Sequence, residues 1–152
     1  MIKHSNGFTL IELILVIVLM TILSAYMAAK LNFASYDADG CAETLKASLR
    51  LGQKLAVAQR TSGTTVAPRA QVNVVLSNTC GITVGASTYP ALHGVSVTNS
   101  GTITFDGLGQ PYISAVLMAV VRTFTITGGG VSRYVCLEAV TGYVHEESAS
   151  CG

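Results

Sequence analysis

The chain has 152 residues, of which 50% are hydrophobic and 11% are charged, and its nine Lys and Arg nearly balance its eight Asp and Glu. This length suits one small domain plus an anchor. The balanced charge excludes a surface whose overall field would attract nucleic acid strongly.

The first predicted element is an apolar helix over Leu10–Ala29. A helix of about 20 residues covers about 30 Å, the thickness of a membrane's hydrocarbon layer. Lys3 and the initiator amine precede the run and Lys30 follows it, so the positive-inside rule leans weakly towards a cytoplasmic N-terminus. A cleaved signal peptide is an alternative because Ala25–Lys30 could mimic its cleavage site, although the apolar core is longer than usual.

Glu12 is the only ionisable residue of this run apart from Tyr26. A carboxylate at the centre of a membrane helix costs roughly 2.5–3.5 kcal/mol, so a compensating interaction is expected. One explanation is local, because Thr9 and Glu12 have the spacing of a capping box. Thr9 would then cap the helix, and Glu12 would lie in its first turn near the positive end of the dipole.

A second helical segment is predicted up to about Gln59. The stretch Asn32–Gly40 contains weak helix formers and one Gly, and a kink or break is expected there. Beyond it the pattern is that of an amphipathic helix. One face is defined by residues that recur at helical spacing: Leu45, Leu49, Gly52, Ala56 and Gln59, with Leu55 alongside.

Another face of this second helix carries Lys46, Arg50 and Lys54 at intervals of four residues. A stripe of this kind is most often a solvated helix face. The alternative is a contact site for an acidic neighbour, anionic lipid or DNA.

The rest of the chain is predicted to form strands. Thr61–Pro68 is a turn-rich connector, after which the hydrophobic period changes from 3.6 to 2 residues. Closely spaced strands with tight turns, including an Asp106-Gly107 hairpin signal, indicate an antiparallel sheet. The Leu45 face of the helix is the candidate cover for it, which gives an α+β fold. The predicted strand segments are Val72–Leu76, Gly94–Val97, Thr102–Phe105, Val116–Thr127, Val131–Glu138 and Thr141–Val144.

Four cysteines occur, and none forms a C-x-x-C pair: Cys41, Cys80, Cys136 and Cys151. If the bulk of the chain lies outside the cytoplasm, two disulfides are expected, and three connectivities are possible. A zinc site that also uses His93 and His145 would match no standard ligand spacing.

No catalytic motif, metal motif or nucleotide-binding fingerprint is present in the sequence, so neither an enzyme nor a cofactor is predicted. Glu146-Glu147 is interpreted as a solubilising tail. Asp37 and Asp39 near Gly40 do not have the spacing of a calcium loop and are interpreted as a polar hinge.

The heptapeptide Gly7-Phe8-Thr9-Leu10-Ile11-Glu12-Leu13, preceded by a short leader, resembles the class III signal of type IV pilins and type II secretion pseudopilins. The resemblance implies that a prepilin peptidase cuts between Gly7 and Phe8 and that Phe8 becomes N-methylated. It also implies that Glu12 of one subunit faces the Phe8 amine of its neighbour in a helical fibre. Two opposite charges about 4 Å apart gain about 4 kcal/mol at an effective dielectric of 20, which is comparable to the cost of burying Glu12.

The resemblance implies four segments: a leader over 1–7, a transmembrane and polymerisation helix over 8–30, an amphipathic helix over 31–60 and a periplasmic β domain over 61–152. It favours disulfides Cys136–Cys151 and Cys41–Cys80. One departure is that the chain has neither Gly nor Pro between Phe8 and Asp39, where pilins usually carry both.

Looser similarities concern the subtype. The Phe105–Pro111 segment and the Arg133–Leu137 segment are similar to parts of H-type minor pseudopilins, and Leu49–Gln59 is similar to minor pilins of the mannose-sensitive haemagglutinin (MSHA) type. The predicted function is a structural minor subunit of an MSHA-like type IV pilus. The alternatives are a minor pseudopilin of type II secretion and a DNA-uptake subunit that uses Lys46, Arg50, Lys54 and Arg60.

The partners that the resemblance implies are other pilin subunits, the prepilin peptidase and an inner-membrane assembly platform. The expected location is the inner membrane, as a single-pass protein with a cytoplasmic N-terminus and a periplasmic C-terminal domain. Incorporation into a pilus or pseudopilus would follow. Nucleic acid is not expected as a partner, because the formal charge is balanced.

Overall fold

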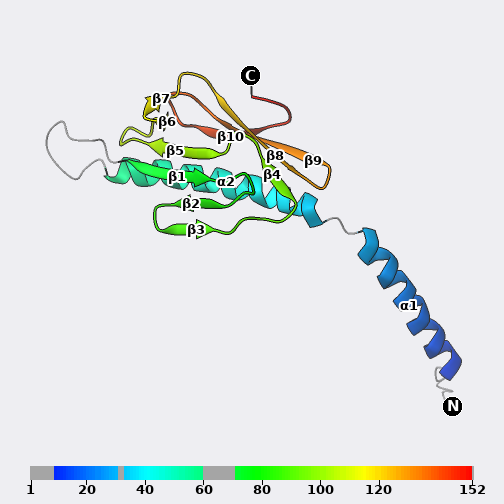
Figure 1. Cartoon of the computed structure of the whole chain (residues 1–152). Coiled ribbons are helices and arrows are strands. Elements are labelled where there is room, and N and C mark those ends of the chain that lie inside the picture. Colours follow the sequence, from blue (N-terminus) through cyan, green and yellow to red (C-terminus); the bar gives the residue numbers. More distant parts are fainter. Residues whose placement is uncertain (1–8, 31–32, 60–70, 152) are drawn as a thin grey trace, which may run out of the picture. The chain divides into compact units, whose positions relative to one another are not determined.

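The computed structural model describes residues 9–30, 33–59 and 71–151. The chain divides into two compact units, the first containing α1 (Leu10–Lys30) and the second beginning with α2 (Phe33–Ala58). Figure 1 labels these elements along the chain. The predicted break lay in Asn32–Gly40; Asn32 is outside the described residues, and Phe33–Gly40 is helical without interruption.

The described residues of the second unit form α2 and ten strands in two antiparallel sheets, which confirms the α+β prediction. The six-stranded sheet has the order β3-β2-β1-β5-β6-β7, and the four-stranded sheet has the order β10-β9-β8-β4. The strands are β1 (Val72–Leu76), β2 (Ile82–Val84), β3 (Ser87–Tyr89), β4 (Val95–Val97), β5 (Gly101–Phe105), β6 (Pro111–Ile113), β7 (Val116–Leu117), β8 (Arg122–Gly128), β9 (Val131–Leu137) and β10 (Val144–Glu147).

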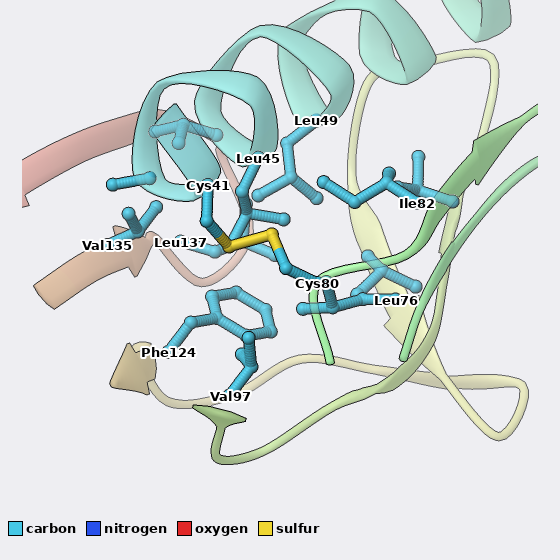
Figure 2. Packing of buried hydrophobic residues seen from close by; sticks show 14 of the residues in the cluster. Cys41, Leu45, Leu49, Leu76, Cys80, Ile82, Val97, Phe124, Val135 and Leu137 are labelled. Carbon is cyan, nitrogen blue, oxygen red and sulfur yellow. A yellow bond between two sulfur atoms is a disulfide. The ribbon is translucent and has the colours of Figure 1, made fainter. Parts of the chain in front are cut away.

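The predicted apolar face of α2 forms the centre of the core. Leu45, Leu49, Gly52 and Ala56 are all buried, and α2 contacts strands of both sheets. The side chains labelled in Figure 2 come from α2 and from both sheets and point into one cluster. The helix therefore covers both sheets, whereas the sequence predicted a single one.

Strand β1 has the alternation that its sequence predicted, with Val72, Val74 and Leu76 buried and the residues between them exposed. It pairs with β2 on one side and with β5 on the other, and Val74 lies opposite Val84 and Ile103. A strand with two paired neighbours and one buried face has a strongly specified register.

The predicted strand Val116–Thr127 is wrong as a single element. Val116–Leu117 pairs with β6 in the six-stranded sheet, whereas Arg122–Gly128 pairs with β9 and β4 in the other sheet. The chain thus crosses between sheets over residues 118–121. The predicted strand at Thr141–Val144 is also displaced, because Val140 and Gly142 have positive φ in a turn and β10 begins only at Val144.

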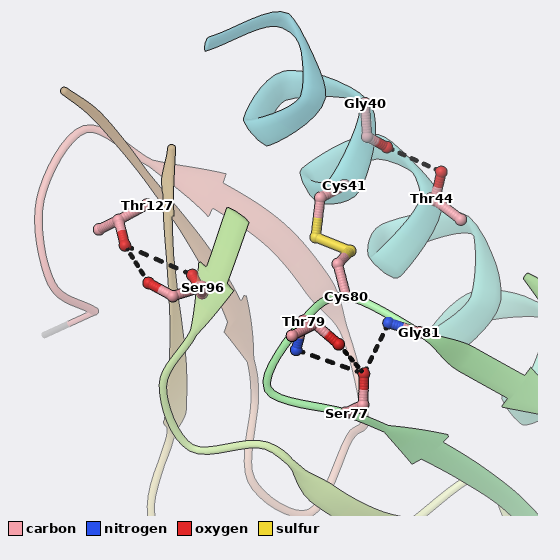
Figure 3. Close-up of a disulfide and its surroundings, with 9 residues drawn as sticks. All are labelled: Gly40, Cys41, Thr44, Ser77, Thr79, Cys80, Gly81, Ser96 and Thr127. Atoms are coloured by element: carbon pink, nitrogen blue, oxygen red, sulfur yellow. Dashed lines mark hydrogen bonds between the residues drawn. A yellow bond between two sulfur atoms is a disulfide. The ribbon is translucent and has the colours of Figure 1, made fainter. Parts of the chain in front are cut away.

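Two disulfides join distant parts of the second unit, Cys41 to Cys80 and Cys136 to Cys151. This is the connectivity that the family resemblance favoured. Cys80 has a φ of 63° at the end of a turn whose backbone N–H groups at Thr79 and Gly81 donate to the Ser77 hydroxyl. Figure 3 shows this turn holding Cys80 against Cys41 of α2.

Candidate processing and assembly segment

The N-terminal helix α1 begins where the capping-box spacing predicted. The backbone N–H of Glu12 donates to the Thr9 hydroxyl at 3.3 Å, and the N–H groups of Glu12 and Leu13 donate to the Thr9 carbonyl oxygen at 3.1 and 3.2 Å. The bonds of Glu12 satisfy an N–H group that the first turn of a helix otherwise leaves unpaired, and the bond of Leu13 is the first regular hydrogen bond of the helix. Thr9 is therefore the N-cap, and Glu12 lies in the first turn.

The Glu12 carboxylate remains available to a partner. The Thr9 hydroxyl oxygen lies 3.5 Å from its Oε2 atom, at the limit of a hydrogen bond. Glu12 is exposed, and the described residues offer it no ion pair. A cation supplied by another molecule could therefore reach it without displacing an existing salt bridge.

Apolar side chains surround α1 on every side. Among the described residues, Leu10–Ala28 is the one helical segment that is long and apolar enough to cross a membrane. None of it is buried within the chain, and the exposed fraction of its large hydrophobic side chains ranges from 42% to 76%. A helix that is hydrophobic all round requires burial elsewhere, either in a bilayer or among other helices.

Gly7 and Phe8, the predicted cleavage and methylation positions, lie outside the described residues. Arg60, the last member of the predicted DNA-contact set, also lies outside them. The predictions for these three residues therefore rest on sequence alone.

The basic stripe on α2 is not a uniform solvated face. Lys46 Nζ lies 2.7 Å from Glu43 Oε1 and 2.7 Å from Glu146 Oε2, and only 13% of its side chain is exposed. Burial lowers the pKa of Lys46, but hydrogen bonds to Glu146 and Glu43 outweigh that effect and leave the pKa raised. Lys46 is therefore already neutralised within the chain.

The other two members of the stripe differ from Lys46. Arg50 donates to the Val144 carbonyl oxygen at 2.8 Å, which ties α2 to the start of β10. Lys54 is exposed. The stripe thus contributes mainly internal contacts between α2 and the four-stranded sheet.

Two further interpretations of acidic residues are wrong. Glu146 is not part of a solubilising tail, since it pairs with Lys46, while Glu147 Oε1 lies 3.5 Å from His145 Nε2. Asp39 is not a hinge residue, because it lies inside α2 and accepts a hydrogen bond from Arg133 Nε of β9. That hydrogen bond lowers the pKa of the Asp39 carboxyl.

The sequence reasoning missed a pair of aromatic side chains at the start of α2. Phe33 and Tyr36 are 66% and 68% exposed, although they lie in a segment that was read only as a weak helix. Their spacing of three residues, directly after an apolar run, was the signal that could have identified them.

Comparison with known families assigns residues 2–28 to the prokaryotic N-terminal methylation motif. Neither the curated proteins nor the solved structures contain a match to the chain. The matched residues include Gly7, Phe8 and Glu12, and from Leu10 onward they overlap the exposed apolar helix described above. The motif is that of structural pilins, which assemble with other pilins after processing by a prepilin peptidase. The N-terminal segment of this protein is therefore a class III prepilin signal, consistent with a type IV pilin or pseudopilin.

Proposed function

We propose that the protein is a structural minor subunit of an MSHA-like type IV pilus and that it assembles through its N-terminal helix. After cleavage at Gly7 the new Phe8 amine would be methylated and remain cationic. The protein would first occupy the inner membrane, with its second unit in the periplasm. An assembly platform would then transfer it into a fibre of other pilin subunits.

The observation that carries this proposal is the combination of a methylation motif with an uncovered apolar helix that bears one carboxylate in its first turn. Burial of that helix among other subunits would supply cohesion, because each buried apolar side chain contributes about 1.5–3 kcal/mol relative to exposure to water. Such burial is non-directional and does not fix the axial register of the subunits. The charge pair between Glu12 and a neighbour's Phe8 amine would fix it, as a single polar group does in a coiled coil.

A minor pseudopilin of type II secretion is the second candidate. It is favoured by the Phe105–Pro111 segment, which is similar to part of H-type minor pseudopilins and connects β5 to β6. Within this segment the buried Asp106 carboxylate accepts hydrogen bonds from the backbone N–H groups of Leu108 and Gln110, both at 2.9 Å. Pilus and pseudopilus subunits share one assembly machinery. Two host strains distinguish the candidates, one that lacks the secretion system and one that lacks the pilus system. The protein should be lost from sheared fibres only in the strain that lacks its own system.

A DNA-uptake role is less well supported, because the Lys46 ammonium group already contacts two carboxylates. A phosphate-binding role predicts association with DNA that weakens steeply as salt rises. We expect the unmodified protein to bind DNA no more strongly than the variant Lys54→Ala does.

The assembly proposal is tested by Glu12→Gln in the native host. The matched control is Glu43→Gln, which also removes one carboxylate but lies on α2, where Lys46 keeps its second partner. We expect Glu12→Gln to be cleaved and inserted normally yet absent from sheared fibres, while Glu43→Gln is present at the level of the unmodified protein. Equal fibre incorporation of both variants contradicts the role of Glu12.

A further inference from the structure

The first turns of α2 present two large aromatic side chains to the outside of the second unit. Phe33 is 66% exposed and Tyr36 is 68% exposed. Residues three apart lie on the same side of a helix, so the two rings form one exposed face. We call this pair the aromatic face.

The opposite side of these turns already has its packing partners. A Cβ atom at Gly128 of β8 would lie 2.5 Å from the Ala34 carbonyl oxygen and 3.2 Å from the Ala38 Cβ atom, and a Cβ atom at Gly94 would lie 3.3 Å from the Ala34 Cβ atom. Small residues on both elements thus bring the helix backbone close to the sheet. The aromatic face is held on a firmly packed turn and points away from the core of its own unit.

The distance of the aromatic face from a membrane is limited by the chain. The apolar segment Leu10–Ala28 has 19 residues, which as a helix cover about 28 Å, nearly the full hydrocarbon layer. Phe33 follows Ala28 by five residues, which reach at most about 18 Å even when fully extended. The headgroup layer on each side of the bilayer is roughly 5–8 Å thick. The aromatic face therefore lies within about 18 Å of the hydrocarbon layer, a range that includes the headgroup layer.

The chemistry of the two side chains suits that layer. Tyr is enriched at membrane–water interfaces because its ring is apolar and its hydroxyl is polar, and Phe occurs on the apolar side of helices that lie in the interface. The nearby Asp39 carboxylate is paired with Arg133, whereas Asp37, next to Tyr36, forms no ion pair with a described residue and must stay hydrated among the headgroups.

We infer that the aromatic face inserts into the headgroup layer of the bilayer and holds the folded unit against the membrane surface before assembly. The inference rests on the proposed function, because it requires α1 to span the membrane. It adds a second membrane contact that belongs to the folded unit itself. Withdrawal of this face from the lipid would then accompany transfer of the subunit into a fibre.

The chain contains no Trp, so a single introduced Trp reports on one position without background. Four variants of the full chain would be reconstituted into vesicles of phosphatidylethanolamine and phosphatidylglycerol: Phe33→Trp, Tyr36→Trp, Val18→Trp and Tyr143→Trp. Val18 lies in the middle of α1 and reports on its insertion. Tyr143 is 60% exposed and adjoins Val144, whose carbonyl oxygen accepts a hydrogen bond from Arg50. Arg50 lies 17 residues along α2 from Phe33, about 25 Å, so Tyr143 serves as the matched aromatic position far from the aromatic face.

Quenching by lipids that are brominated at different depths of their acyl chains is the readout. We expect the Trp residues at positions 33 and 36 to be quenched several-fold more than the Trp at position 143, and most strongly by bromine close to the headgroup. The Trp at position 18 should be quenched best by deeply placed bromine.

The inference is overturned if positions 33 and 36 are quenched no more than position 143 while position 18 is quenched strongly. In that case α1 spans the membrane but the aromatic face remains in water, where a neighbouring subunit in the fibre would be its occupant instead. If position 18 is not quenched, the membrane span fails, and the proposed function and this inference fall together.

Discussion

Gly52 of α2 is the position at which close packing between the helix and the six-stranded sheet is tested most directly. A Cβ atom built at Gly52 would lie 2.5 Å from Val74 Cγ2 and 3.4 Å from Phe105 Cδ2. Val74 cannot yield easily, because it is fully buried in β1 between two paired strands and a Val side chain is stiff at χ1. Gly52→Ala therefore forces the helix and the strand apart.

The expected magnitude follows from two opposing effects. Ala favours a helix interior over Gly by about 1 kcal/mol, whereas overpacking a core costs about 1–3 kcal/mol. Gly52→Ala should lower the free energy of unfolding by about 0–2 kcal/mol. Gly40→Ala in the same helix is the matched control, because a Cβ atom there meets nothing within 4 Å. That substitution should raise the free energy of unfolding by about 1 kcal/mol.

Urea unfolding of the full chain in mild detergent, followed by near-ultraviolet circular dichroism, measures both variants. The two unfolding free energies should differ by about 1–3 kcal/mol, with Gly40→Ala the more stable. Equal stability of the two variants would mean that α2 does not lie as close to β1 as the structure places it.

Three further predictions concern a disulfide, a side chain that binds two loops and an ion pair. Replacement of both Cys136 and Cys151 by Ala should cost about 3 kcal/mol of stability in the chain-entropy model, for a separation of 15 residues, measured by urea unfolding with and without reductant. Gln53→Leu removes hydrogen bonds to two loop carbonyl oxygens at 3.0 and 2.9 Å, so amide exchange in both loops should accelerate, at a cost of about 1–3 kcal/mol. Because the hydrogen bond from Arg133 lowers the pKa of Asp39, the ion pair stabilises the fold above the unfolded-state pKa of 3.8 and loses that effect as pH falls through the lower folded-state value. In the variant Asp39→Asn the free energy of unfolding should therefore fall less steeply as the pH is lowered, and an unchanged pH dependence would contradict the pairing.

Local periodicity predicted the helix face and the first strand correctly. Leu45 and Leu49 repeat at helical spacing and are fully buried, and Val74 lies in a strand whose buried and exposed residues alternate and is also fully buried. Such patterns depend only on whether one side of an element is buried. They do not depend on which partner covers that side.

The division into two sheets was not predictable from the same patterns. The run Val116–Thr127 is rich in β-branched residues, and it contains no Gly, Pro, Asn or Asp to mark the place where the chain passes from one sheet to the other. Strands β2, β3 and β6 have three residues each and were not predicted. Strands this short are stabilised by their neighbours rather than by a local signal.

The candidate assembly segment was predictable because its signal is local. The capping role of Thr9 and the first-turn position of Glu12 follow from residues three apart. The ion pair between Lys46 and Glu146 was not predictable from the sequence, because the two residues lie 100 positions apart and only the fold brings them together. A basic stripe read from helical spacing alone therefore overestimated the free positive charge of α2.

The central claim is that residues 2–28 are processed and used as a prepilin signal. Mass spectrometry of the mature protein from its native host tests this claim most directly. We expect an N-terminal peptide that begins with a monomethylated Phe8. A mature chain that still begins at Met1, or that begins after the apolar helix in the region of Ala25–Lys30, would contradict it.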